Sequence, residues 1–200
     1  MKERKEEFTT ESGISIKPVY THEDVAHLRL EETLGAPGQQ PFTRGIYPSM
    51  YRSKLWTIRQ FTGFATPEET NERFKMEYEL GQTGFSIAFD AVTESGLDPD
   101  DPRVAGDVGM GGVPVTSLLD MEAMFDGLPI DKVSTAVIAT PWNACALSAM
   151  YFALSEKRGI PLEALDGTTQ NDLLLFTGCC KLTDIIPPGD MIRLSVDLVE

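Results

Sequence analysis

Apolar runs alternate with amphipathic segments over the last two thirds of the chain, and this pattern predicts strands that alternate with helices. The apolar runs are short and nearly continuous, as buried strands of a parallel sheet are. We predict strands at 85–90, 133–140 and 164–169. We predict helices at 67–80, 117–125 and 143–158, a helical run after 172, and a further helix within 185–199.

The helix boundaries carry residues with known preferences. Thr66 before Pro67 predicts an N-cap followed by proline in the first turn, and Gly81 ends that helix. Ser117 and Asp120 are typical of an N-terminal cap on the next helix.

Strands that alternate with helices imply parallel pairing through right-handed crossovers. We therefore expect an α/β fold with about three β/α units over residues 66–200, preceded by an N-terminal arm and ligand-binding segment over residues 1–65. Within that arm, 14–20 alternates and stops at a proline, which predicts a short edge strand or an extended arm. Glycines and prolines over 32–43 predict a loop.

Composition narrows the function classes. The 200 residues fit one globular domain or part of a larger one, and the net charge of −14 argues against a general nucleic-acid surface. No apolar run approaches the ~18 residues that span a bilayer, and the charged N-terminus does not resemble a secretory signal. The odd set of three cysteines indicates reduced thiols and a cytoplasmic location. His22 and His27 lie five positions apart, so we predict no metal site.

Polar residues near the carboxyl ends of the predicted strands are candidates for function, because parallel α/β folds place their sites there. For Asp90 and Thr140 a capping role and a functional role both remain open. Five consecutive polar residues over 168–172 exceed what one cap requires, and this favours a functional role. The candidates are Asp90, Thr93, Thr140, Asn143, Thr168, Thr169 and Gln170.

The segment 44–64 is basic and aromatic, and it lies in an acid-free window from 33 to 67. An even spread of the 31 acids would place about five in that window. Cations suit phosphates and rings suit a flat base or a dry channel, so we predict an extended, polyanionic, partly flat ligand. The alternative is that the rings are ordinary core and the cations a solvated face. The residues are Arg44, Arg52, Lys54, Arg59, Tyr47, Tyr51, Trp56, Phe61 and Phe64.

The same segment, RGIYPSMYRSKLWTIRQFTGF, resembles the acyl-CoA-threading segment of the adenosylcobalamin-dependent acyl-CoA mutases. The resemblance continues through GQTGFSIAFD, GDVGMGGVPVTSLLDMEAMFDGLPIDKVST, EKRGIPLEALDGTTQND and IIPP, and it covers nearly the whole chain from Gly13. It implies the N-terminal part of a (β/α)8 TIM barrel, with coenzyme A threaded along the barrel axis. The implied reaction is a carbon-skeleton isomerisation, with radical chemistry supplied by adenosylcobalamin.

The resemblance also implies site residues. Phe61 and Gln170 are the catalytic candidates, and Phe61 also borders the cofactor. Thr169 stands where the family usually has isoleucine in a TIQ segment that contacts the acyl group. The implied substrate-binding residues are Tyr47, Pro48, Ser49, Met50, Thr57, Ile58, Arg59, Gln60, Phe61, Thr168, Thr169 and Gln170.

Two positions bear on the substrate. Methylmalonyl-CoA mutases carry tyrosine where this chain has Phe61, and isobutyryl-type enzymes carry phenylalanine. Methylmalonyl-CoA mutases also carry an arginine that pairs with the substrate carboxylate. The matching position in this chain is Cys180 when counted forward from the QND motif, and Lys181 when counted back from the two prolines of IIPP. We therefore expect a non-carboxylated branched acyl-CoA such as isobutyryl-CoA. Methylmalonyl-CoA is the alternative if Lys181 substitutes for the arginine.

The chain departs from the family in its extent, because a barrel needs eight β/α units and about three are predicted. The family's catalytic histidine and DxHxxG signature have no counterpart here. We expect part of a large subunit that is inactive alone and is completed by further chain or by a cobalamin-binding small subunit, in a hetero-oligomer or dimer. The rival hypothesis is a non-catalytic CoA-binding or assembly module that a second chain completes.

Overall fold

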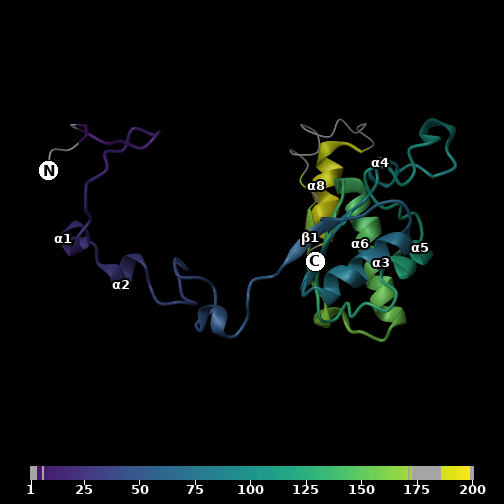
Figure 1. The fold of residues 1–200 in the computed structure, drawn as a ribbon. Coiled ribbons are helices and arrows are strands. Elements are labelled where there is room, and N and C mark those ends of the chain that lie inside the picture. Colours follow the sequence, from purple (N-terminus) through teal and green to yellow (C-terminus); the bar gives the residue numbers. More distant parts are fainter. Residues whose placement is uncertain (1–3, 6, 171, 173–185, 199–200) are drawn as a thin grey trace. The chain divides into compact units, whose positions relative to one another are not determined.

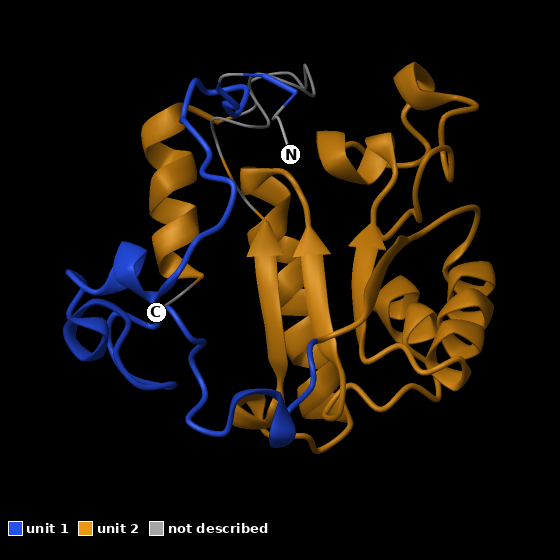
Figure 2. Cartoon of the chain, turned by 60° about the vertical axis from the view of Figure 1, so that its left-hand side comes forward, with its two compact units in different colours: residues 1–56 blue, residues 57–200 orange. Residues whose placement is uncertain are grey.

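The structure is a computed structural model that describes residues 4–5, 7–170, 172 and 186–198. The chain divides into two compact units, 1–56 and 57–200, which Figure 2 shows in different colours.

The second unit is built on four parallel strands whose spatial order follows their order in the chain. This is an α/β arrangement in which strands and helices alternate, consistent with part of a TIM barrel (Figures 1 and 2). The strands are β1 (Arg59–Thr62), β2 (Gly84–Ala88), β3 (Ser134–Ile138) and β4 (Asp166–Gln170).

Helices connect the strands. Helix α6 contacts β3 and β4, and α8 packs against α6. The helices of this unit are α3 (Pro67–Glu79), α4 (Ala91–Ser95), α5 (Leu118–Met124), α6 (Pro141–Lys157) and α8 (Pro188–Asp197), with 3₁₀ turns η2 (Pro102–Val104) and η3 (Leu162–Ala164).

The core lies between one face of the sheet and these helices. Phe74 of α3 and Phe85 of β2 have ring centroids 4.6 Å apart, and Phe125 and Tyr151 extend the cluster at 5.2 Å. Phe85 is fully buried. Because successive strand residues point to opposite faces, the residues next to Phe85 in β2 face away from this core.

The predicted caps are confirmed. The Thr66 hydroxyl accepts a hydrogen bond from the backbone N–H of Glu69, and Pro67 occupies the first turn of α3. Ser117 and Asp120 form a reciprocal capping box at the start of α5. These groups satisfy backbone donors that a helix start leaves without intrahelical partners.

The sequence prediction missed strand β1, so four strands stand where about three β/α units were expected. Only Thr62 of its four residues is buried, which hides the strand from a hydrophobic pattern. The Thr62 hydroxyl donates to the buried Glu77 carboxylate at 2.9 Å, and Arg73 and Gln82 also donate to that carboxylate. Partners distant in sequence therefore hold β1 in place.

Other predictions need correction. Of the two alternatives predicted for 14–20, the short edge strand does not form: these residues are exposed, and Ser15 pairs only in an isolated bridge with Thr9. The strand predicted to reach Asp90 ends at Ala88, and the short helix α4 was missed. The predicted loop at 32–43 begins inside a helix that ends at Thr33.

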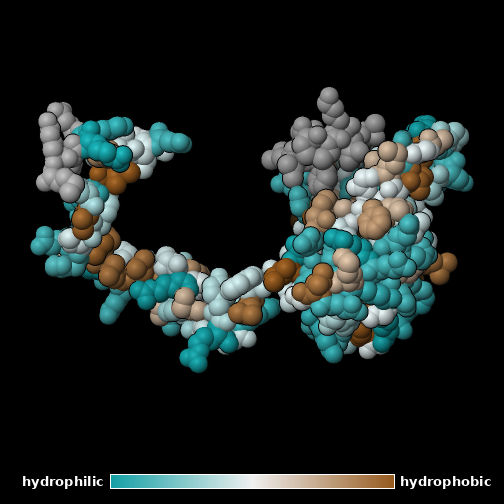
Figure 3. Space-filling model, viewed as in Figure 1, coloured by the Kyte–Doolittle hydropathy of each residue, from teal (hydrophilic) through white to brown (hydrophobic). Residues whose placement is uncertain are grey.

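The first unit has no core of its own, since none of the described residues of 1–56 is buried. Large apolar side chains lie on its surface, as Figure 3 shows in brown. Its regular elements are the short helices α1 (His22–Val25) and α2 (Leu30–Thr33) and the 3₁₀ turn η1 (Met50–Arg52). Among the helices that the structure describes, none has the length and apolar character required to cross a membrane.

Candidate functional site

One face of the sheet carries small residues on its two central strands. Residues on neighbouring strands that are paired in register stand side by side, and every second residue points to the same face. We call this the small-residue face. Three rows cross it: Arg59, Gly84, Ser134 and Asp166; Phe61, Ser86, Ala136 and Thr168; and Ala88, Ile138 and Gln170.

Arg59 crosses this face from β1. Its guanidinium donates to the Thr168 hydroxyl at 3.2 Å and also to the Ser134 hydroxyl. Gly84 of β2 lies beneath that path, and a Cβ there would stand 3.2 Å from Arg59 Nε and 2.6 Å from the Ser134 carbonyl oxygen. Glycine at 84 therefore gives the arginine room to reach β4.

Phe61 lies one row further along β1, and 64% of it is exposed. Ser86 and Ala136 stand between Phe61 and Thr168 in the same row. Three strand spacings of ~4.8 Å separate the two outer residues by about 14 Å along the sheet. The small side chains of Ser86 and Ala136 thus form the floor between a phenylalanine and a threonine, two of the predicted site residues.

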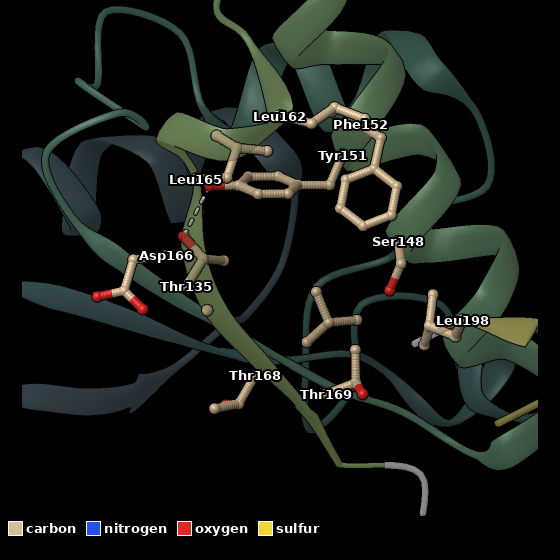
Figure 4. A pocket seen from close by; sticks show the side chains of 12 residues that line it. Thr135, Ser148, Tyr151, Phe152, Leu162, Leu165, Asp166, Thr168, Thr169 and Leu198 are labelled. Atoms are coloured by element: carbon tan, nitrogen blue, oxygen red, sulfur yellow. Dashed lines mark hydrogen bonds between the residues drawn. The ribbon is translucent and has the colours of Figure 1, made fainter. Parts of the chain in front are cut away.

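The predicted polar cluster on β4 divides between the two faces. Thr168 and Gln170 lie on the small-residue face with Phe61, whereas Thr169 points to the helix face. There Thr169 borders a cavity of about 430 Å³ between β4, α6 and α8, shown in Figure 4. Thr168 also borders this cavity, so Thr168 and Thr169 share the cavity at the sheet edge, whereas Thr168 and Gln170 share the small-residue face.

That cavity is largely apolar, with Leu162, Leu165 and Phe152 on its wall. Its polar groups include the Tyr151 hydroxyl, which is 3.0 Å from the Thr135 hydroxyl. The Ser148 hydroxyl is buried without a hydrogen-bond partner among the described residues. The cavity adjoins β4, which is an edge strand of the described sheet.

The remaining strand-end candidates make structural contacts, and Asp90 has the capping role that was one of the two left open. Its side chain caps α4 by accepting from Thr93 N–H at 2.8 Å, and its second oxygen accepts from Gly109 N–H at 2.8 Å. The Thr93 hydroxyl accepts from Val115 N–H, and the Asn143 amide donates to the Thr93 carbonyl.

Thr140 engages a residue that sequence reasoning missed. Its N–H donates to the Glu94 carboxylate at 2.7 Å, and its hydroxyl donates to the Glu94 carbonyl at 2.9 Å. The Trp142 indole N–H donates to the same carbonyl at 3.1 Å. Burial, with a smaller contribution from the nearby Asp90 carboxylate, raises the pKa of Glu94 from 4.5 to about 7, against the opposing effect of the Thr140 hydrogen bonds. No local sequence signal marks this contact, because its partners lie 46 and 48 residues away.

The other predicted site residues lie in two units. Tyr47, Pro48, Ser49 and Met50 belong to the first unit, where they are exposed at η1. Thr57, Ile58 and Gln60 belong to the second unit; the Ile58 carbonyl accepts from Gly84 N–H at 3.1 Å, and Gln60 N–H donates to the Gln82 side chain at 3.3 Å.

No cluster of three or more histidine, cysteine or acidic residues suited to a metal ion occurs in the part of the chain that the structure describes. Asn171, Cys180 and Lys181, of which the last two were weighed as substrate-selecting positions, lie outside the described residues.

Comparison with known proteins places this chain in a family. The family model described as methylmalonyl-CoA mutase matches residues 9–200. A 2-hydroxyisobutanoyl-CoA mutase large subunit from Aquincola tertiaricarbonis is 48% identical over 98% of this chain and 34% of its own length. A methylmalonyl-CoA mutase large subunit from Streptomyces virginiae is 44% identical over 94% of this chain and 25% of its own. The mitochondrial methylmalonyl-CoA mutase of Homo sapiens is 42% identical over 96% of this chain and 25% of its own.

The chain thus spans between a quarter and about a third of the length of these relatives. Nearly the whole of the chain takes part in each match, including both segments that carry the predicted site residues. The chain belongs to the methylmalonyl-CoA mutase family.

Proposed function

We propose that this chain supplies the first strands of the catalytic barrel of an adenosylcobalamin-dependent acyl-CoA mutase. The proposed substrate is a non-carboxylated branched acyl-CoA such as isobutyryl-CoA, and the proposed location is the cytoplasm. The observation that carries the proposal is the shared face of Arg59, Phe61, Thr168 and Gln170, residues from opposite edges of the described sheet, in a chain of this family.

The residues of this face have distinct proposed roles. Arg59 holds the Thr168 hydroxyl through a hydrogen bond. Thr168 begins the polar segment 168–170 of β4, which we propose faces the acyl group. Gln170 offers an amide that can hydrogen-bond the thioester carbonyl and orient it. Phe61 supplies an apolar wall that excludes water from the reacting carbons.

The residues present also fit the cofactor. An exposed phenylalanine ring beside a floor of Ser86 and Ala136 leaves room for a broad planar group, and aromatic rings pack well against such groups. Phe61 is the residue of this chain that we propose to border it. When bound, adenosylcobalamin would supply the radical chemistry, while the protein positions the substrate and keeps water away.

Methylmalonyl-CoA is the alternative substrate, since two of the relatives named above are methylmalonyl-CoA mutases. Phe61 argues against it, because a phenyl ring offers no hydroxyl to a substrate carboxylate. Both β1 and β4 are edge strands of the described sheet. We therefore propose that further strands and a cobalamin-binding subunit or domain complete the enzyme.

Calorimetric titration tests the proposal. CoA and isobutyryl-CoA are titrated into the chain, before and after the addition of a cobalamin-binding subunit and adenosylcobalamin. We expect binding in the assembled state, together with conversion of isobutyryl-CoA to its straight-chain isomer. Binding of CoA without any turnover would favour the non-catalytic module, and no heat in any mixture would count against both.

A further inference from the structure

The third row of the small-residue face differs from the other two. Ile138 of β3 is paired in register with Ala88 on one side and Gln170 on the other. On the two central strands, the other residues of this face are glycine, alanine or serine. Ile138 is therefore the one bulky apolar side chain that the two central strands contribute to this face.

Several observations place Ile138 on this face and not in the core. Its neighbours in sequence, Val137 and Ala139, belong to the buried core cluster, and Ile138 does not. Its side chain is half-buried, whereas Val137 and Ala139 are nearly inaccessible. The alternation of a strand then directs Ile138 toward the row of Gln170.

The charges on this face also favour an uncharged acyl group beside Ile138. Phe61, Ser86, Ala136, Ile138 and Gln170 are uncharged, so the described part of the second and third rows offers no cation. The nearest cation of the face is Arg59, whose guanidinium already donates to the Ser134 and Thr168 hydroxyls. Among the residues that the structure describes, a carboxylate beside Ile138 would have no free cation to pair with, and an unpaired buried charge is unfavourable.

We infer that Ile138 is a specificity-determining residue, whose branched apolar side chain selects a branched aliphatic acyl group held at Gln170 and disfavours a carboxylated one. This inference rests on the proposed function and deepens it. The side chain acts by contact: its methyl groups meet the acyl branch, and its bulk at the ends of the strands limits how far the acyl group extends. Phe61 provides the second apolar wall, one row away on β1.

The experiment compares three forms of the assembled enzyme, which combines the full chain with the polypeptide for the remaining strands, a cobalamin-binding subunit and adenosylcobalamin. The forms are wild type, Ile138→Thr and Ile138→Val. The kcat/KM values are measured for isobutyryl-CoA and methylmalonyl-CoA, and the inhibition constant is measured for free CoA. Threonine nearly keeps the shape of valine but adds a hydroxyl, so the pair separates polarity from size.

We expect Ile138→Thr to lower the preference for isobutyryl-CoA over methylmalonyl-CoA by about tenfold, and Ile138→Val to change it by less than about threefold. Inhibition by free CoA should stay the same in all three forms, because the acyl pocket lies beyond the CoA tail. A purely structural role would lower both kcat/KM values together and leave their ratio unchanged.

The outcomes separate the two proposals. An unchanged ratio in an active Ile138→Thr enzyme would overturn the role of Ile138 and leave the mutase function standing. Turnover of neither ester by the wild type would overturn the mutase function and this inference with it. If Ile138→Thr does not assemble, Ile138→Ala serves instead: a smaller side chain should admit longer acyl groups, and unchanged chain-length selectivity would overturn the inference.

Discussion

Replacement of Glu94 by glutamine should make the protein more stable at neutral and alkaline pH. The Glu94 side chain accepts from Thr140 N–H at 2.7 Å in a half-buried position. Burial raises its pKa to about 7, so ionisation in the folded state is unfavourable. Glutamine keeps an acceptor for Thr140 and carries no charge, so the variant avoids that cost.

The size of the effect follows from linkage. A folded pKa of about 7 against 4.5 is a shift of about 2.5 units, which corresponds to about 3 kcal/mol at 1.36 kcal/mol per unit. Because the folded pKa is raised, the stability contributed by the neutral carboxyl is fully present below about pH 4.5. It is lost as the pH rises to about 7, and little further change follows above that value.

The difference in the free energy of unfolding is measured by urea titration, with tryptophan fluorescence as the signal. The chain has two tryptophans, and a Trp56→Phe background leaves Trp142, whose indole donates to the Glu94 carbonyl, as the reporter. Wild type and Glu94→Gln are compared from about pH 4.5 to about pH 8, with Glu163→Gln as the control at an exposed carboxylate. The variant should gain about 3 kcal/mol over wild type across this range. A difference that stays constant with pH would refute the reasoning, as would an equal gain in the control.

Three other predictions follow from contacts and from the proposed substrate. Gly63→Ala should destabilise the fold by roughly 2 kcal/mol or more, because its Cβ would lie 2.0 Å from the Ala88 carbonyl oxygen; Gly189→Ala, which meets nothing within 4 Å, is the control in the same urea titration. Ser117→Ala should lower the free energy of unfolding by about 1 kcal/mol through loss of the capping box, and an unchanged urea midpoint would contradict this. In the assembled enzyme, Phe61→Tyr alone should raise the turnover of methylmalonyl-CoA relative to isobutyryl-CoA by no more than about tenfold. A full switch of substrate would contradict the view that a cation at a second position is also needed to hold the carboxylate.

Much of the fold could be predicted because its signals are local. Helices α3 and α5 start at the expected caps, and β2 and β3 coincide with the apolar runs to within two residues. Strand β1 has no such signal, since its stability depends on pairing with β2 and on the contact between Thr62 and Glu77. Helix α4 was missed because Phe89 extends the apolar run, while Asp90 caps a helix of five residues.

The sequence could predict which segments contribute to the site, but not how their side chains are arranged. The sequence singled out segments at 57–61 and 168–170, but their common face depends on the register across four strands. Register is a property of tertiary pairing, and a shift by one residue would exchange the faces of every side chain. For the same reason the sequence could not show that Thr169 points away from Thr168, or that Glu94 meets Thr140.

The small-residue face has a consequence for how a barrel built from this sheet would be filled. TIM barrels usually fill their interior with layers of bulky branched side chains. Here Gly84, Ser86 and Ala136 occupy inward positions of β2 and β3, and such residues cannot fill a layer from these strands. A completed barrel would therefore keep free space along its axis on this side, as an extended ligand requires. Ile138 lies at the carboxyl end of β3, where that space would narrow. Under the proposed function, the reacting end of the ligand would therefore lie beside Ile138 and its long tail over the small residues.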